Sequence, residues 1–416
     1  MKKMSLVLTL LLLSAFLSSY SLAAETAQAT PASSFKIDGK TLDKFIGDET
    51  EVVIPEGVTK IDECAFYRCD SIKSVVIPEG VKIIGDHAFF ICDSLTSVVI
   101  PDSVKKIGTR AFSGCPALKE WIISPTHPHF KTDGTGLLTK DGKKLLACLN
   151  TAKEYRIPDG VTKIEFGAFF GCESLTSVVI PEGVTKIGDM MFDECHSLKS
   201  VVIPKGVKEI GEDAFCCCFS LTSLVLPEGV TKIGNAFGGC ESLTSLVIPD
   251  SVKEIEIGTF SGCTAMKEWG FSPTNPYFKT DGPALLTKDG KKLLSCLYWA
   301  KEYRIPDGVT TIEAYAFVGR DSLTSVVIPE SVREIGQHAF LGCDSLKSVV
   351  IPNGVQLIGH YAFMECRSLT SVEIPGSVTE IWYGAFLDCP NLTIRAPKGS
   401  YAEKYAKEHG IPFEVK

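Results

Sequence analysis

Cysteine is the residue type in this chain with the most chemical potential. A thiol can form a disulfide, hold a metal ion or act as a nucleophile. The chain has 416 residues and 16 cysteines. Most of them recur at spacings of 22 or 23 residues or across longer insertions, which indicates a packing position rather than a reactive one. The eleven recurring cysteines are Cys69, Cys92, Cys115, Cys172, Cys195, Cys218, Cys240, Cys263, Cys343, Cys366 and Cys389.

Other motifs for catalysis are absent from the sequence. His127-x-His129 is the only histidine pair with a spacing typical of metal ligands, and a surface loop is the favoured interpretation. Asn275 and Tyr277 stand 148 residues further on, in a matching segment. The sequence has no G-x-S-x-G, P-loop or H-E-x-x-H motif. We therefore expect no enzyme, no bound metal and no cofactor, and a hydrolase with an unrecognised site is the weakest alternative.

The elements that carry these residues are a repeat, marked by an Ile-Pro or Leu-Pro step. The step recurs every 23 residues, once after 22 and twice after 57. Each gap of 57 contains 34 additional residues, and the two additions match each other. The prolines are Pro55, Pro78, Pro101, Pro158, Pro181, Pro204, Pro227, Pro249, Pro306, Pro329, Pro352 and Pro375.

Each repeat has a strand-like half and a turn-like half. In the repeat around Pro181, period-two alternation directs Leu175, Val178 and Ile180 inward and Val179 outward. A Phe follows about eleven residues after each proline, usually behind an Ala, and this segment predicts one turn of α-helix or 3₁₀-helix. A single repeat cannot bury its apolar face, but stacked copies can, so the pattern predicts a solenoid.

Stacking also decides what we expect of the cysteines. Neighbouring strands lie about 4.8 Å apart, farther than the roughly 3.8 Å between disulfide-bonded Cβ atoms. We expect most thiols to be buried and free, with disulfides between adjacent coils as the alternative and metal binding less favoured. Cys216 or Cys217 is a candidate exposed thiol, although a loop thiol without a role is preferred. Cys148 and Cys296 occupy equivalent places in the additional segments and are expected to pack there.

The N-terminus and the charge indicate an exported protein. Two lysines, an apolar run from about Leu6 to Leu17 and small residues up to Ala23 are typical of a secretory signal peptide. Because no cysteine lies near the cleavage site, we do not expect a lipid anchor. We also expect no transmembrane segment in the mature chain and no C-terminal anchor. The formal charge of −8 becomes −10 once Lys2 and Lys3 are removed, and its interspersed signs disfavour nucleic acid.

The repeat L-x-x-[VL]-x-[IL]-P-x-x-V-x-x-I-G-x-x-A-F-x-x-C resembles that of the BspA-like leucine-rich-repeat proteins of bacterial surfaces, over about residues 35–416. The resemblance implies a strand-dominated α/β leucine-rich-repeat solenoid with two β-hairpin insertions and two caps. It implies adhesion to host, matrix or cell-surface protein. The expected parts are a signal peptide (1–24), a linker and N-terminal cap hairpin (25–50), the solenoid (51–390, inserts about 121–157 and 269–305) and a C-terminal cap (391–416).

Two surfaces remain for a partner. The first is the outward side of the strands, where Thr or Lys, then Ser, then Val recur. An apolar row with hydroxyl edges suits an extended partner or another copy of the chain, although Val and Thr also simply favour strands. The residues proposed for this face are Lys73, Val76, Thr96, Val99, Thr176, Val179, Lys199, Val202, Thr222, Val225, Thr244 and Val247. Glu373 replaces the Val in the last repeat.

The second surface is the aromatic cluster near the insertions, because aromatic side chains are enriched in interface hot spots. It comprises Trp121, His129, Trp269, Tyr277 and Trp299, of which Trp121 and Trp269 are equally compatible with the core. We expect a partner to be an extracellular matrix or cell-surface protein. Self-association as an envelope component is the alternative.

Overall fold

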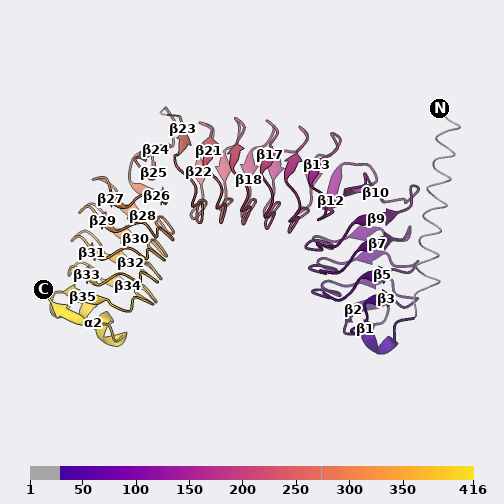
Figure 1. The fold of residues 1–416 in the computed structure, drawn as a ribbon, viewed down its shortest axis with the longest axis horizontal. Coiled ribbons are helices and arrows are strands. Elements are labelled where there is room, and N and C mark those ends of the chain that lie inside the picture. Colours follow the sequence, from indigo (N-terminus) through magenta and orange to yellow (C-terminus); the bar gives the residue numbers. More distant parts are fainter. Residues whose placement is uncertain (1–28, 273) are drawn as a thin grey trace. The chain divides into compact units, whose positions relative to one another are not determined.

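The structure, a computed structural model, describes residues 29–272 and 274–416. The predicted signal peptide, residues 1–24, lies outside the described residues. The chain divides into two compact units, of which the first ends at Phe219 and the second begins at Ser220. Within each unit the backbone winds through short parallel strands joined by turns (Figure 1), which is the architecture of a solenoid.

Each coil contributes one strand to a first row of parallel strands, formed by the residues that precede the Ile-Pro or Leu-Pro step. The register places equivalent residues side by side, so that Val178 pairs with Val201 and Val179 with Val202. These strands are β3 (Glu51–Val53), β5 (Ser74–Val76), β7 (Ser97–Ile100), β9 (Glu120–Ile123), β13 (Glu154–Arg156), β15 (Ser177–Val179) and β17 (Ser200–Val202) in the first unit, and β19 (Ser223–Val225), β21 (Ser245–Ile248), β23 (Gly270–Phe271), β27 (Glu302–Arg304), β29 (Ser325–Val327), β31 (Ser348–Val350), β33 (Ser371–Glu373) and β35 (Thr393–Ala396) in the second.

A second row of two-residue strands follows the proline turn and was not anticipated from the sequence. It places the recurrent Ile inward, as in the pairing of Ile187 with Ile210. Its strands are β4 (Lys60–Ile61), β6 (Ile83–Ile84), β8 (Lys106–Ile107), β14 (Lys163–Ile164), β16 (Lys186–Ile187), β18 (Glu209–Ile210), β20 (Lys232–Ile233), β22 (Glu254–Ile255), β28 (Thr311–Ile312), β30 (Glu334–Ile335), β32 (Leu357–Ile358) and β34 (Glu380–Ile381).

The segment around the recurrent Phe is not the predicted turn of helix but a run of tight turns. Its amides alternate between two kinds of partner: Cys64 N and Phe66 N donate to carbonyls of the next coil, whereas Tyr67 N donates to Cys64 O at 3.1 Å. Cys64 and Arg68 have φ of 56° and 55°, in the left-handed region. A helix cannot include such residues, and the prediction was wrong because stacking offers the amides a better partner than a helix would.

The recurrent Phe side chains form the centre of the core. Phe317, Phe340 and Phe363 are fully buried, with ring centroids 4.7 Å and 5.0 Å apart in consecutive pairs. The predicted inward residues Leu175, Val178 and Ile180 are buried as well. Offset stacking of identical rings adds to the burial of apolar area, so the same side chain at the same place stabilises each coil against the next.

Both insertions are antiparallel. The first comprises β10 (Phe130–Thr132), β11 (Gly136–Thr139) and β12 (Lys144–Cys148), and the second β24 (Phe278–Asp281), β25 (Ala284–Thr287) and β26 (Lys292–Cys296). Each third strand then pairs in parallel with the second row, as Leu145 does with Ile164. At the predicted turn, Gly142 has φ of 71° and the Asp141 carboxylate accepts from Lys143 N at 2.9 Å.

The two ends of the coil stacks are covered. A 3₁₀-helix η1 (Ala32–Ser34) leads into the antiparallel pair β1 (Phe35–Asp38) and β2 (Thr41–Phe45). Helix α2 (Tyr401–Glu408) and strand β36 (Phe413–Val415) close the other end, where β36 pairs with β35. Among the residues that the structure describes, no helix has the length and apolar character that crossing a bilayer requires.

Candidate functional site

The outward side of the first strand row presents valines unevenly. Val202, Val225 and Val247 are 57%, 68% and 51% exposed, and Val179 is half-buried. Val76 and Val99 are only 8% and 6% exposed, so the expectation of an exposed row in their coils is wrong. Period-two alternation shows by which face a side chain leaves the sheet, but not what covers that face.

The polar edge of this face is partly used within the fold. Lys73, Lys199, Thr222 and Thr244 are exposed, whereas Thr96 and Thr176 are half-buried. Several of these threonine hydroxyls donate to the carbonyl of the equivalent residue one coil earlier. Such pairs are Thr96 Oγ1 to Lys73 O at 3.0 Å, Thr176 Oγ1 to Lys153 O at 2.8 Å and Thr244 Oγ1 to Thr222 O at 3.0 Å. These threonine hydroxyls therefore stabilise the stack, and the exposed valines are the apolar part of the face that a partner can reach.

In the second unit the valine positions resume after the second insert, where Arg304 pairs with Val327, and they end where charged residues replace them again. Val327 and Val350 are 44% and 58% exposed. Val350 then pairs with Glu373, and Glu373 with Arg395. Arg395 Nε donates to Glu414 Oε2 at 2.8 Å on β36. The apolar row therefore ends at Glu373, beside the C-terminal cap.

Trp121 belongs to the protein interior, and Trp269, at the equivalent place, is half-buried. Trp121 is 6% exposed and meets the Phe112 ring edge-on at 5.5 Å between centroids. Trp269 meets Phe260 in the same way at 5.0 Å. Both indole N–H groups donate to an insert carbonyl, Trp121 to Thr135 O at 3.1 Å and Trp269 to Pro283 O at 2.9 Å. The tryptophans thus close the Phe stack where an insert interrupts it.

His127 is buried, which corrects the prediction of a surface loop for this residue. Its Nδ1 accepts from His129 N at 3.1 Å and Phe130 N at 3.0 Å, and its Nε2 lies 3.1 Å from Pro101 O. Burial lowers the pKa of the imidazole. Asn275 Oδ1 accepts from the equivalent amides in the second insert, at 2.9 Å and 2.8 Å. Both side chains hold a turn, and neither ring nitrogen of His127 is available to a metal ion.

The remaining insert aromatics are exposed. His129 is exposed, Tyr277 is 36% exposed and Trp299 is 53% exposed. Trp299 is also held in place, because its indole donates to Lys267 O at 3.0 Å. A fixed, exposed indole is suited to a contact surface, since little conformational entropy is lost on binding.

A further aromatic surface escaped the sequence analysis. Tyr315 stacks on His338 at 4.9 Å between ring centroids, and His338 on Tyr361 at 5.1 Å. Beside them, Trp382 packs at 4.8 Å from His360 and Tyr383 is 66% exposed. The sequence does contain a pattern for this surface, namely aromatic residues seven to nine positions after Pro306, Pro329, Pro352 and Pro375. These positions lie in turns, so the alternation of side chains along a strand does not predict which way they face.

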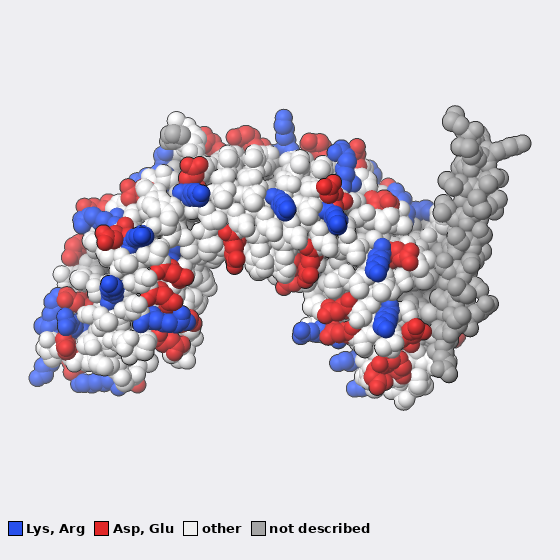
Figure 2. Space-filling view, viewed as in Figure 1, with Lys and Arg blue, Asp and Glu red and all other residues white. Residues whose placement is uncertain are grey.

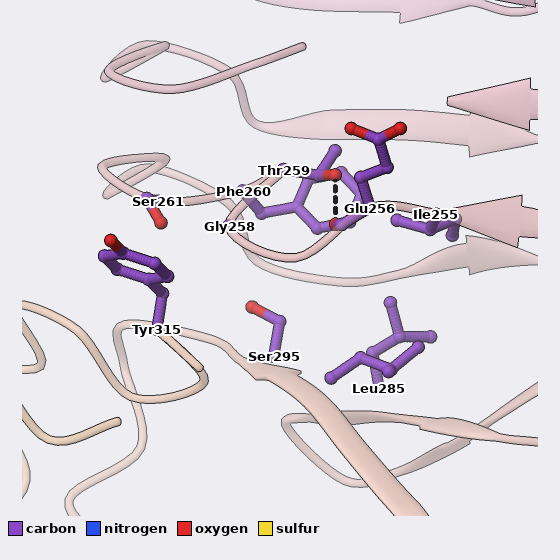
Figure 3. Close-up of a pocket in the computed structure, with 10 residues that line it drawn as sticks. Ile255, Glu256, Gly258, Thr259, Phe260, Ser261, Leu285, Ser295 and Tyr315 are labelled. Carbon is purple, nitrogen blue, oxygen red and sulfur yellow. Dashed lines mark hydrogen bonds between the residues drawn. The ribbon is translucent and has the colours of Figure 1, made fainter. Parts of the chain in front are cut away.

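The described residues of the second unit form a groove and a smaller cavity. A groove of about 440 Å³ between the last coil and the cap is lined by Tyr383, Leu387, Cys389, Tyr405 and His409 among others. A smaller cavity, of about 10 Å³, holds at most one water molecule. Figure 3 shows Ser261 and Tyr315 on one side of this small cavity and Leu285 on the other. It is too small for an organic ligand, whereas the groove has the size of a ligand site.

Arg320 occupies the position of the recurrent cysteine in its coil and is 2% exposed. Its guanidinium lies over the Tyr298 ring, 3.7 Å from the centroid, and donates to the backbone carbonyls of Cys296 and Val318. These contacts satisfy a buried cation through the ring face and the carbonyl dipoles. Arg320, in place of the recurrent cysteine, therefore packs beside the second insert and does not form a reactive site.

The recurrent cysteines form a regular ladder of thiol donors. Cys92 Sγ donates to Phe66 O at 3.1 Å, and Cys343 Sγ to Phe317 O at the same distance, in each case one coil earlier. Burial raises the pKa of the Cys343 thiol to about 12, which keeps the proton needed for donation. All sixteen cysteines lie within the described residues and carry free thiols.

Among the described residues, two clusters bring three metal-ligating side chains together. One consists of Glu63, Cys64 and His87, and the other of Asp193, Cys216 and Cys217, with ligand atoms within 4.8 Å of one another in each. Burial, with Glu194 and Asp213 nearby, raises the pKa of Asp193 to about 6.

On the face in Figure 2, acidic and basic side chains are interspersed over each unit without a large patch of one sign.

A known protein family has the repeat described above. The family model described as the BspA type leucine rich repeat region matches residues 45–133, 142–267 and 295–402 in six copies. No curated protein sequence matches the chain.

Several solved structures are similar to this chain. A leucine rich cell surface protein from Faecalibacterium prausnitzii A2-165 is 28% identical, with a TM-score of 0.51, over 92% of this chain and 98% of its own. A leucine-rich repeat protein from Bacteroides ovatus is 26% identical, with a TM-score of 0.38, over 88% and 84%. The leucine rich repeat protein of T. pallidum is 27% identical, with a TM-score of 0.32, over 52% and 85%. Because the family model covers well over half of the chain and describes the repeat that forms its coils, the protein belongs to the BspA-type leucine-rich-repeat family.

Proposed function

We propose that the protein is exported and binds other proteins at the cell surface without catalysing a reaction, as an adhesin that engages a matrix or cell-surface protein. The supporting observation is the exposed valine row of the first strand row, with Val225 and Val247 directly paired and 68% and 51% exposed. Solvated apolar side chains at regular intervals provide a contact surface that gains free energy when a partner covers it.

The comparison with the Faecalibacterium protein supports the location, since that protein is described as a cell surface protein and is similar over nearly its full length. The repeated geometry supports the mode of binding. Equivalent weak sites along one face bind an extended or multivalent partner with higher affinity than any single site.

The test is a binding screen of the mature protein against purified extracellular matrix proteins and intact cells. The double variant Val225→Lys/Val247→Lys places two charges on the valine row, and binding should fall at least tenfold because the lysines must be desolvated. The matched control is Asn353→Lys/Asn391→Lys, which adds the same charge at exposed positions outside the strands. Equal binding by both folded variants would remove the valine row as the binding surface.

Two further variants locate the surface if the valines are not responsible. Tyr277→Ala/Trp299→Ala removes the exposed insert aromatics, and Trp382→Ala/Tyr383→Ala removes the aromatic surface of the last coils. The screen itself tests the function, because a folded protein that binds no tested surface contradicts the adhesin proposal.

Self-association through the same valines is the second candidate function. The valine row is accessible in both units, at Val202 in the first and at Val350 in the second. Light scattering coupled to size-exclusion chromatography separates the two candidates. A mass that rises with concentration, and that Val225→Lys/Val247→Lys returns to the monomer value, supports self-association. A concentration-independent monomer contradicts it.

A further inference from the structure

We propose that Asp193, Cys216 and Cys217 form a binding site for a zinc ion. The three side chains come from consecutive coils of the first unit, and their ligand atoms lie within 4.8 Å of one another. All three are half-buried, so a cation can reach them while much of its surroundings is protein. This site is independent of the valine row and was not expected from the sequence.

The distance between the two sulfur atoms fits a tetrahedral metal. Cys216 Sγ and Cys217 Sγ are 3.6 Å apart. In a tetrahedral site with zinc–sulfur bonds of about 2.3 Å, two sulfur ligands are about 3.8 Å apart. The thiols therefore already lie near the separation that a shared ion requires. A carboxylate is a common third zinc ligand, and water completes the tetrahedron.

The repeat provides an internal control for this cluster. Asp193 and Cys216 hold the same position in their coils, twelve residues after Pro181 and Pro204. At this position the other coils mostly carry apolar or small side chains, namely Tyr67, Phe90, Ser113, Phe170, Ser261, Val318, Leu341, Met364 and Leu387. A carboxylate followed by a thiol is thus a departure from the packing pattern, which is expected of a functional group and not of a structural one.

The backbone holds the ligands firmly. Glu194 N donates to Cys216 O at 3.0 Å between the two coils, and Cys216 N donates to Asp213 O at 3.0 Å within one. Cys217 has φ of 55°, the turn conformation that recurs at this place, so its side chain leaves the turn beside that of Cys216. Ligands fixed by such bonds lose little entropy on binding an ion.

The charges nearby favour a cation. The carboxylates of Glu194 and Asp213 are near enough to act on Asp193 electrostatically. Arg110 is the neighbouring base, but its guanidinium is packed against the Phe166 and Phe170 rings, at 4.7 Å and 4.3 Å from their centroids. Arg110 acts on Asp193 electrostatically and opposes the two carboxylates, but among the ion pairs of the described residues none joins Arg110 to Asp193, so the carboxylate remains available to a metal ion.

The binding step balances in protons. The two thiols bind the ion as thiolates and each releases one proton, while the carboxylate binds as it is, so that one Zn²⁺ displaces two H⁺. The cluster of Glu63, Cys64 and His87 provides a comparison within the same chain. It offers only one thiol, and Glu63 is exposed, so we expect it to bind zinc more weakly.

The test uses the full mature chain, reduced and kept without oxygen, and titrated with Zn²⁺ by calorimetry and with Cd²⁺ by the ultraviolet charge-transfer band of cadmium thiolate. We expect one tight equivalent and the release of two protons. Cys216→Ser/Cys217→Ser should abolish the band, and Asp193→Leu, which restores a side chain found at this position in other coils, should weaken binding at least tenfold. Cys64→Ser is the matched control and should leave the titration unchanged.

The outcomes separate clearly. Loss of the band in Cys216→Ser/Cys217→Ser with retention in Cys64→Ser supports the site. Absence of a tight equivalent in the reduced protein, or a titration that depends on Cys64 instead, overturns the proposal. Circular dichroism confirms the fold of each variant, and because Asp193→Leu follows the packing pattern, its loss of affinity cannot be attributed to a misfolded coil.

Discussion

The thiol of Cys195 donates a hydrogen bond to the backbone carbonyl of Phe169, with 3.1 Å between Sγ and O. The two residues are 26 positions apart and lie in consecutive coils. The same contact recurs along the ladder, for example from Cys366 to Phe340 at 3.1 Å. The Phe169 carbonyl also accepts from Cys172 N at 3.0 Å within its own turn, so the cysteine thiol of the next coil supplies a second donor to a buried carbonyl.

Cys195→Ala should lower the free energy of unfolding by about 0.5–1.5 kcal/mol, because it removes one of the two hydrogen bonds that the buried Phe169 carbonyl accepts. Urea denaturation measures the change. Cys64→Ala is the control, since Cys64 is half-buried and outside the ladder, and it should change stability by less than about 0.5 kcal/mol. Equal effects of the two variants would contradict a structural role for the ladder.

Most of the sixteen thiols should react when the protein is denatured without a reducing agent and alkylated. The reason is that the ladder sulfur atoms point at backbone carbonyls and are separated by the coil spacing rather than by disulfide geometry. Mass spectrometry counts the alkyl groups. If a majority of the cysteines were blocked as disulfides, the ladder would be an oxidised framework and this interpretation would fail.

Phe340→Ala should destabilise the second unit by about 3–5 kcal/mol, because it leaves a cavity between two stacked rings. Phe340→Leu should cost less, since it keeps most of the volume. Thermal or urea unfolding measures both. Tyr67→Leu, at a ring that is 44% exposed, is the control and should have little effect. A Phe340→Ala variant as stable as the control would show that the rings do not carry the stack.

Acidification should destabilise the first insert through His127. Burial lowers the pKa of its imidazole below the unfolded value of about 6.5, so the unfolded chain binds a proton that the folded chain resists. This stability is fully present above about pH 6.5 and is lost as the pH falls from there towards the folded pKa. Unfolding measured between about pH 8 and pH 5 should show the loss.

His127→Asn is the diagnostic variant, because Asn275 already performs the same turn-holding role in the second insert. It should cost about 1 kcal/mol at pH 8, by losing the contact with Pro101 O, and should flatten the dependence on pH. An unchanged acid response in His127→Asn would place the sensitivity at another group.

Local pattern was sufficient for much of the fold. The inward set, such as Leu175, Val178 and Ile180, followed from period-two alternation, and the hairpin turn at Asp141-Gly142 from turn chemistry. Both rest on forces between near neighbours in the chain. The turns around Phe66 did not follow, because their amides bond to the next coil and no local propensity reports a partner 22 residues away.

The position of a residue in the repeat, by contrast, does not show how far its side chain lies from other side chains. The sequence alone shows that Asp193 and Cys216 are equivalent residues and that His127 corresponds to Asn275. Only the stacked coils decide that Asp193 meets two sulfur atoms and that His127 is buried against Pro101. The repeated core is determined by the sequence because each side chain is buried against its own copy. The surfaces are determined by the tertiary structure because exposure and proximity depend on what the neighbouring coils place beside each residue.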